Sequence, residues 1–170
     1  MNLQYIRTYS GIGKIVIIIF GIAVLVIGCL SHYESEWRKI YKDPYVSKWR
    51  EDGYDIPQPS IEEYYVAMII FSLTLSLINI IGTLIVDVTK GRIKLVDFVS
   101  HILVAVLLLI AGSLYVSSAK RLEKHGKDFR WDDQSEIKLL LGYKLVAGSL
   151  VIVQAVLYGV VAFFIWRENP

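Results

Sequence analysis

The sequence predicts an all-α integral membrane protein, a four-helix bundle with antiparallel up-down topology and two larger loops on one side. Two observations lead to this class. Hydrophobic residues make up 55% of the 170 residues and the mean hydropathy is +0.50, which is too apolar for an ordinary soluble domain. Windows long and apolar enough to cross a hydrocarbon core of about 30 Å as helices lie at residues 12–30, 65–86, 98–116 and 145–166. An even number of spans puts both chain ends on one side.

The remaining segments are expected to be loops of a single four-pass domain that covers residues 1–170, and the loops lie at residues 31–64, 87–97 and 117–144. Cys29 is the only cysteine, so no intrachain disulfide and no two-cysteine metal or redox motif can form. A formal net charge of +2 gives no electrostatic footprint for nucleic acid. Arg7 and Lys14 before an apolar run resemble a signal peptide, but the long segment before Lys14 and three later spans favour an uncleaved first span.

The first span carries small residues on one helical stripe, because Gly13, Gly21, Gly28 and Ser31 recur at helical spacing. Small residues let helix backbones approach closely, and close packing drives helix association in lipid. Gly21 and Gly28 are therefore predicted helix-packing positions.

The first loop, residues 31–64, is rich in charged and aromatic residues and contains Trp37 and Trp49. These tryptophans have two interpretations, an interfacial belt with loop packing or an adhesive surface for another protein. Interfacial aromatic residues are common at helix ends, which favours the first. We treat Trp37, Trp49 and, in the third loop, Trp131 as candidate loop contacts.

The second span has a polar face, formed by Ser72, Ser76, Asn79 and Thr83. Polar side chains in lipid are expected to turn inward and bond to neighbouring helices, at about 0.6 kcal/mol per bond. A transport pathway is the alternative interpretation. Transporters usually need an intramembrane charge, and this window has none.

The second loop is short and basic, with Lys90, Gly91, Arg92 and Lys94 close together. It lacks the paired glycines and the terminal Lys-Ser/Thr of a phosphate-binding loop. We interpret it as a cytosolic helical hairpin turn, where Gly91 permits the reversal and the cations meet anionic lipid. Asp97 is expected near the start of the third helix, where the helix dipole favours a carboxylate.

The third span places His101 and Gly112 on one stripe. A metal or haem role for His101 would need a partner histidine at membrane depth, whereas His32 and His125 are expected in loops. We therefore expect His101 to be hydrogen-bonded near the interface and predict no cofactor or metal.

The last helix is predicted to begin at Asp133, because Glu136 follows it with the spacing of a capping box. It would then enter the bilayer near residue 145, with Lys144 reaching to the interface. Gln154 stands alone near mid-depth and is expected to bond across the bundle, to the polar face of the second span. The predicted packing positions on this span are Gly148, Ala155 and Gly159.

The orientation in the membrane is less clear than the topology. Twelve lysines and arginines lie in the first and third loops and six on the side with both termini, although the density of basic residues is nearly equal. Net charge, +3 on the terminal side and −1 on the loop side, favours cytosolic termini.

The four-pass layout, with a large first loop, a short second loop and a third span beginning "KLVDFVSHILVAVLLLIAGSLY", resembles the MARVEL-type tetraspan proteins, whose members include occludin, the physins and the MAL proteolipids. The chain is also similar in size and layout to snakeskin. The resemblance implies a bundle with cytosolic termini, found where membranes adhere or form specialised lipid regions, and it brings no catalytic residues. The lack of loop cysteines is a departure from occludin and the physins, and it argues against a disulfide-braced loop.

The expected function is non-enzymatic: a membrane protein that organises cell-junction or vesicle assemblies through lateral helix packing and loop contacts. Its expected partners are the lipid bilayer and other membrane proteins or further copies of itself, in the plasma membrane or a vesicle, and not nucleic acid. The alternative is an auxiliary subunit or transporter for ions or small solutes. An enzyme ranks third, because among Asp, Glu, His and Cys the four windows contain only His101 and Cys29.

Overall fold

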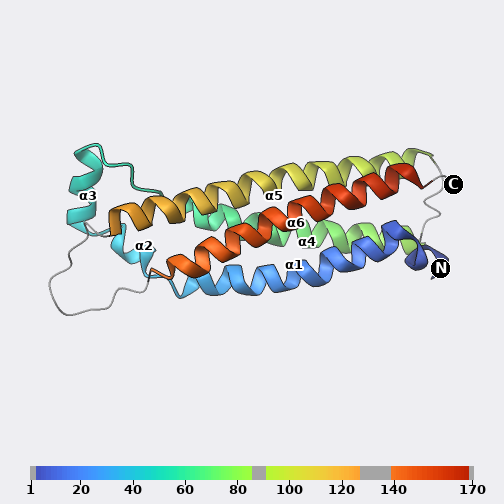
Figure 1. Cartoon of the computed structure of the whole chain (residues 1–170), viewed down its shortest axis with the longest axis horizontal. Coiled ribbons are helices and arrows are strands. Elements are labelled where there is room, and N and C mark those ends of the chain that lie inside the picture. Colours follow the sequence, from blue (N-terminus) through green and yellow to red (C-terminus); the bar gives the residue numbers. More distant parts are fainter. Residues whose placement is uncertain (1–2, 86–90, 127–138, 169–170) are drawn as a thin grey trace.

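Four long helices dominate the computed structural model, which describes residues 3–85, 91–126 and 139–168 (Figure 1). The described residues contain no strand. The long helices are α1 (Tyr9–Tyr33), α4 (Ser60–Ile85), α5 (Gly91–Gly126) and α6 (Leu141–Arg167), and the short ones are η1 (Leu3–Arg7), α2 (Trp37–Ile40) and α3 (Pro44–Glu51).

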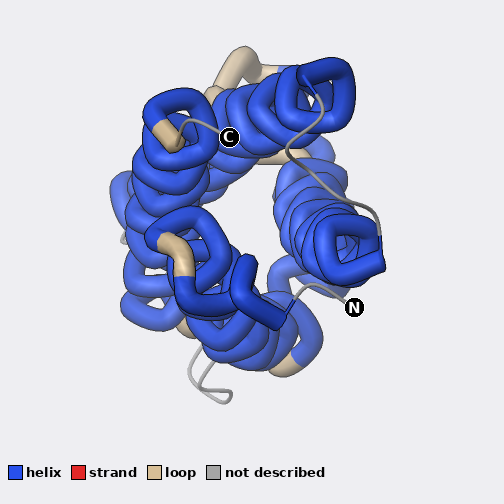
Figure 2. The backbone as a smooth tube through the Cα atoms, turned by 90° about the vertical axis from the view of Figure 1, so that its right-hand side faces the viewer, coloured by secondary structure: helices blue, strands red, loops and turns tan. Residues whose placement is uncertain are grey.

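The long helices form an antiparallel bundle in which α1 and α5 each pack against both α4 and α6 (Figure 2). The pairs α1/α5 and α4/α6 therefore lie diagonally across the bundle. Both chain ends lie at one end of the bundle, here named the terminal end, and α2 and α3 lie at the opposite loop end (Figure 1). This arrangement confirms the predicted all-α, up-down four-helix bundle.

The bundle is apolar on its outside as well as in its core. Each long helix has at least 25 residues, enough to cross a hydrocarbon core of about 30 Å. Large aliphatic side chains point outward from all four, for example Ile19, Ile78, Val99 and Val156. An exterior of this kind suits lipid and not water. The protein is therefore a membrane protein with four helices able to span the bilayer.

Exposed aromatic residues mark both edges of this apolar surface. Tyr9 and Trp166 lie at the terminal end, and Tyr33, Tyr64 and Tyr143 lie at the loop end. Tyrosine and tryptophan gather at membrane–water interfaces because one part of each ring system is apolar and another is polar. The two groups therefore locate the two interfaces.

The helices are longer than the apolar windows that predicted them. The third helix continues past residue 116 to Gly126, and the second begins at Ser60 instead of residue 65. The physical reason is that helices continue beyond the hydrocarbon, where polar residues replace apolar ones. The last helix begins at Leu141 after a left-handed Leu140 with φ 49°, so it does not run unbroken from Asp133, which lies outside the described residues together with Glu136.

Part of the predicted first loop folds into a small structure, here named the loop module, that comprises α2, α3 and the chain to Ile56. Its own core consists of Trp37, Val46 and Ile56, which pack against Leu122 from the extension of α5. Asp43 caps α3 by accepting a hydrogen bond from the Tyr45 backbone N–H at 2.9 Å.

The loop tryptophans have different positions. Trp37 is fully buried in the module, so its side chain is not available to a partner. This position agrees with the loop-packing interpretation. Trp49 is half-buried, with its ring 5.7 Å from that of Tyr54. Trp131 lies outside the described residues.

Predicted packing positions lie where helices approach closely. A Cβ built on Gly112 would lie 2.9 Å from the Gly148 carbonyl oxygen, which makes this pair the crossing of α5 and α6. Gly21 lies against Gln154 and Leu73, Gly28 lies against Tyr65, and Ala155 is buried. Gly159 differs from the prediction, because a Cβ there would lie within 4 Å of no atom of another helix in the described part of the chain.

Candidate functional site

Two clusters of ionisable side chains lie inside the bundle, one near each end. The terminal cluster consists of Lys14, Asp97 and His101, and the loop cluster of Lys144, Glu62 and His32. Each therefore contains one lysine, one carboxylate and one histidine. The side chains of both lysines are 1% exposed, and those of the carboxylates 4–5%.

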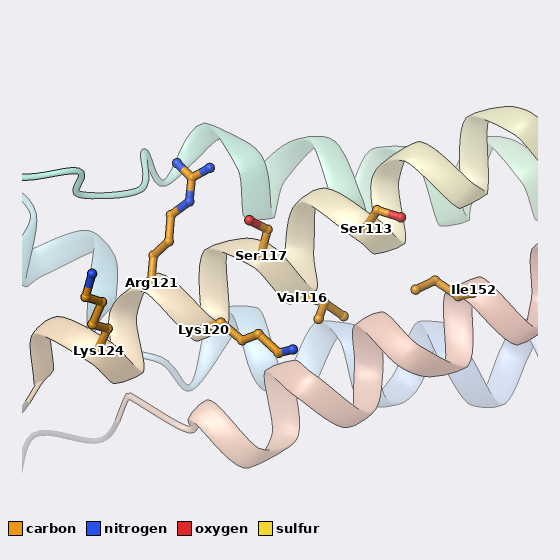
Figure 3. A pocket seen from close by; sticks show the side chains of 7 residues that line it. All are labelled: Ser113, Val116, Ser117, Lys120, Arg121, Lys124 and Ile152. Atoms are coloured by element: carbon orange, nitrogen blue, oxygen red, sulfur yellow. The ribbon is translucent and has the colours of Figure 1, made fainter.

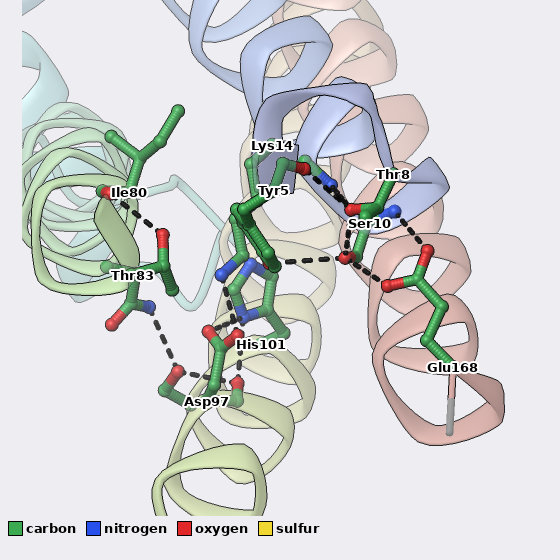
Figure 4. A network of polar contacts seen from close by, with 12 residues as sticks. Tyr5, Thr8, Ser10, Lys14, Ile80, Thr83, Asp97, His101 and Glu168 are labelled. Atoms are coloured by element: carbon green, nitrogen blue, oxygen red, sulfur yellow. Dashed lines mark hydrogen bonds and ion pairs between the residues drawn. The ribbon is translucent and has the colours of Figure 1, made fainter. Parts of the chain in front are cut away.

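In the terminal cluster, Lys14 Nζ lies 2.6 Å from Asp97 Oδ2 (Figure 4). His101, one turn further along α5, has its Nδ1 2.8 Å from the Asp97 backbone oxygen and 3.3 Å from Asp97 Oδ1. A carbonyl only accepts hydrogen bonds, so this contact places a proton on Nδ1. The buried Nε2 of His101 has no hydrogen-bond partner among the described residues.

The chain ends close over the terminal cluster. The Tyr5 ring centroid lies 5.2 Å from Lys14 Nζ, a cation–π geometry. Glu168, just after α6, accepts a hydrogen bond from the Ser10 backbone N–H at 3.0 Å and another from the Ser10 hydroxyl at 2.5 Å (Figure 4). A carboxylate at the N-terminus of α1 is favourable because it satisfies an unpaired N–H and the helix dipole. Thr8 caps the same helix by accepting from the Gly11 N–H at 3.1 Å.

In the loop cluster, Lys144 Nζ lies 2.5 Å from Glu62 Oε1, and His32 Nδ1 lies 3.2 Å from Glu62 Oε2. Glu62 lies in the first turn of α4, Lys144 in the first turn of α6, and His32 in the last turn of α1. The expectations that Lys144 reaches to the interface and that His32 lies in a loop are therefore wrong.

The two ion pairs connect helices that lie diagonally across the bundle. Lys14 and Asp97 join α1 to α5, and Lys144 and Glu62 join α6 to α4. In a low-dielectric interior, each charge is tolerated because it has an opposite charge in contact. One ion pair thus joins α1 to α5 at the terminal end, and the other joins α4 to α6 at the loop end.

Between the clusters, the polar face of the second span is used for internal hydrogen bonds. The Tyr158 hydroxyl donates to the Ser72 backbone oxygen at 3.0 Å, so Ser76, 2.5 Å away, donates its proton to Tyr158. Asn79 Nδ2 donates to Ser100 Oγ at 3.0 Å.

The hydroxyls of Ser72 and Thr83 bond within α4 itself, to the carbonyls of Ile69 and Ile80. Among the described residues, these two hydroxyls therefore do not link α4 to a neighbouring helix.

Gln154 is fully buried, yet neither its Oε1 nor its Nε2 has a hydrogen-bond partner among the described residues. The predicted bond to the polar face of the second span is therefore wrong. The hydroxyl of Ser76 is engaged by Tyr158, and that of Ser72 by its own helix. The Gln154 amide instead packs against Gly21.

Two tyrosines stack in the core below the loop cluster. The ring centroids of Tyr65 and Tyr115 are 4.0 Å apart with an interplanar angle of 14°. The Tyr115 hydroxyl lies 2.9 Å from Ser31 Oγ, the residue before His32, so the polar interior continues up to the loop cluster.

The predicted hairpin turn is only partly described. Lys90 lies outside the described residues, and Gly91 is the first residue of α5. Arg92 is exposed, whereas Lys94 donates a hydrogen bond to the backbone oxygen of Glu168. Lys94 therefore binds the end of α6 within the protein.

Sequence reasoning missed both clusters, although signals for the terminal cluster were present. Lys14 inside an apolar window requires a buried counter-charge. Asp97 and His101 are one turn apart on one helix, so both must face the same side. Across the three described ranges, no three His, Cys, Asp or Glu side chains come together in a way that could hold a metal ion.

No protein-family model, no curated protein and no solved structure matches this chain. The resemblance to MARVEL-type proteins therefore stays a prediction, and the geometry carries the functional argument.

Proposed function

We propose that this protein is a non-enzymatic membrane organiser, in which the bundle is a stable base and the loop module makes contacts with another membrane protein or a second copy. The observation that carries the proposal is the loop module itself, which has its own buried core and is joined to the bundle through Leu122 of α5.

The surface of the module supports a role in protein contacts. Tyr45 is 75% exposed and Tyr54 is 51% exposed, on a module where Arg38, Lys39 and Lys48 also reach the solvent. Tyrosine and arginine are enriched at protein interfaces because they combine apolar contact area with hydrogen bonding. Inside the bundle, in contrast, the charged groups pair with each other, which suits a rigid support.

Photo-crosslinking in native membranes tests this proposal. A photoreactive phenylalanine derivative in place of Tyr45 is expected to give discrete protein adducts, whereas the same replacement of Tyr9, at the other interface, is expected to give none. The tagged protein is expected to be enriched at cell contacts or on vesicles. An absence of adducts from position 45, together with a diffuse monomeric distribution in the tissue, would contradict the proposal.

A second candidate, a transporter for protons or small ions, is favoured by the terminal cluster. The buried Lys14 and Asp97 provide the intramembrane charge that transport pathways usually contain, and the unpartnered His101 Nε2 is a proton acceptor in the interior.

Flux measured in proteoliposomes tests the second candidate. If it is right, ion or proton flux exceeds that of empty vesicles, and it falls in the variants Asp97→Asn and Asn79→Leu. The matched control Asp55→Asn changes an exposed carboxylate and is expected to leave flux unchanged. Flux equal to that of empty vesicles would exclude this function.

A further inference from the structure

A groove runs along the seam between α5 and α6 at the loop end, with a volume of 490 Å³ (Figure 3). Its chemistry changes along its length. Val116 and Ile152 give it an apolar part, Ser113 and Ser117 add two hydroxyls, and Lys120 and Lys124 follow toward the end of α5. All but Ile152 come from α5.

The position of the groove matches the edge of the bilayer. Tyr115 is hydrogen-bonded to Ser31, close to the loop cluster and to the exposed aromatic Tyr33, so it lies near the interface. At about 1.5 Å per residue, Lys120 and Lys124 lie about 7.5 and 13.5 Å beyond Tyr115 along α5. The apolar part of the groove therefore faces the hydrocarbon edge, and Lys120 lies at headgroup depth. Lys124 lies one turn further out, and its long side chain can reach back to the headgroups.

We propose that this groove binds one anionic phospholipid, with its phosphate between Lys120 and Lys124 and the start of an acyl chain against Val116 and Ile152. Lys120 and Lys124 are one turn apart on α5 and both are exposed. Their ammonium groups point in different directions in the structure (Figure 3), and rotation of the two side chains would bring both to one phosphate. Ser117, one turn before Arg121, offers a hydroxyl to the same headgroup. An acidic peptide would leave the apolar part without a complement.

The charges around the groove support an anionic occupant. Arg121 also borders it, and its guanidinium lies 2.8 Å from the exposed Asp55 carboxylate. Glu123 lies on the same stretch of α5 but does not line the groove. The two lysines therefore leave the groove itself with an excess of positive charge.

Native mass spectrometry of protein released from nanodiscs tests the proposal. In discs that contain phosphatidylserine and phosphatidylcholine, the wild-type chain is expected to retain one phosphatidylserine. The variant Lys120→Gln/Lys124→Gln is expected to lose about 30-fold in preference for the anionic lipid, since one lysine near the surface contributes about fivefold.

The matched control is Lys42→Gln/Lys48→Gln, which removes the same charge from exposed positions of the loop module and is expected to keep the preference. Ser113→Phe fills the apolar part of the groove from an exposed position and is expected to lower lipid retention although both lysines remain. Helical content measured for every variant separates lost binding from lost folding.

Three outcomes would overturn the proposal: equal retention of the two lipids by the wild-type chain, equal loss in the control, or a lipid-free dimer that buries the groove. None of these bears on the crosslinking test of the loop module. If the site takes phosphatidylserine in cells, where anionic lipid is concentrated in the cytosolic leaflet, the loop end is cytosolic. That orientation agrees with the greater number of basic residues in the two large loops and reverses the expectation from net charge.

Discussion

Replacing Lys144 by methionine is expected to lower the free energy of unfolding by about 3–5 kcal/mol, because it leaves the Glu62 carboxylate buried without its counter-charge. The loss is large because Glu62 is only 3% exposed and its other contact is with His32. Unfolding in detergent micelles, followed by circular dichroism against denaturant or temperature, measures it.

The double variant Lys144→Met/Glu62→Leu is expected to recover most of this stability, since it removes both buried charges together. The matched control is Lys39→Met, which removes an exposed lysine 3.7 Å from Glu36 and is expected to change stability by less than about 1 kcal/mol. If Lys144→Met unfolds like the wild type, the ion pair does not hold the α4/α6 diagonal together.

Replacing Gly112 by leucine is expected to destabilise the bundle by about 1–3 kcal/mol or more through overpacking. Even the first carbon of the new side chain would lie 2.9 Å from the Gly148 oxygen and 2.9 Å from Ile152 Cγ1. The backbone oxygen cannot move aside as a flexible side chain can, so α5 and α6 must separate. The same unfolding measurement in micelles gives the effect.

Gly159→Leu provides the control on α6. Apart from its chain neighbours and the nearby backbone of α6 itself, no atom of the described residues lies within 4 Å of the position of its Cβ, so a side chain can begin there without a clash. Leucine also favours a helix over glycine by roughly 0.5–1 kcal/mol. This variant is expected to be as stable as the wild type or slightly more stable. A loss of stability equal to that of Gly112→Leu would show that the close approach of α5 and α6 at Gly112 is not the cause of the destabilisation.

The fold could be predicted from the sequence because membrane spans are a property of continuous segments. The apolar windows fall within the four long helices, apart from residue 86, which lies outside the described residues. Helical periodicity also places Ser72 and Ser76 on the inward face of α4. The same periodicity does not give the distance to a neighbouring helix, and for that reason Gly148 lies at a crossing while Gly159 does not.

The charge clusters could not be predicted in this way, because they depend on pairing between distant segments. Lys14 meets Asp97, and Glu62 meets Lys144, across the bundle diagonals. The apolar windows also begin directly after Asp97 and Lys144, at residues 98 and 145, which made both residues look interfacial. The hydrogen bond between Ser76 and Tyr158 was missed for a related reason, because Tyr158 lies in an apolar span and its hydroxyl was not considered as a partner.

The spacing of the clusters bears on hydrophobic mismatch. Lys14 and His32 are separated along α1 by about 27 Å at 1.5 Å per residue, and the flanking Tyr9 and Tyr33 by about 36 Å. Hydrocarbon thicknesses of about 27 Å in the endoplasmic reticulum and about 32–33 Å in the plasma membrane both fall within this interval. Bilayer thickness alone would therefore not retain this protein in one compartment, and its residence would depend on what its surfaces bind.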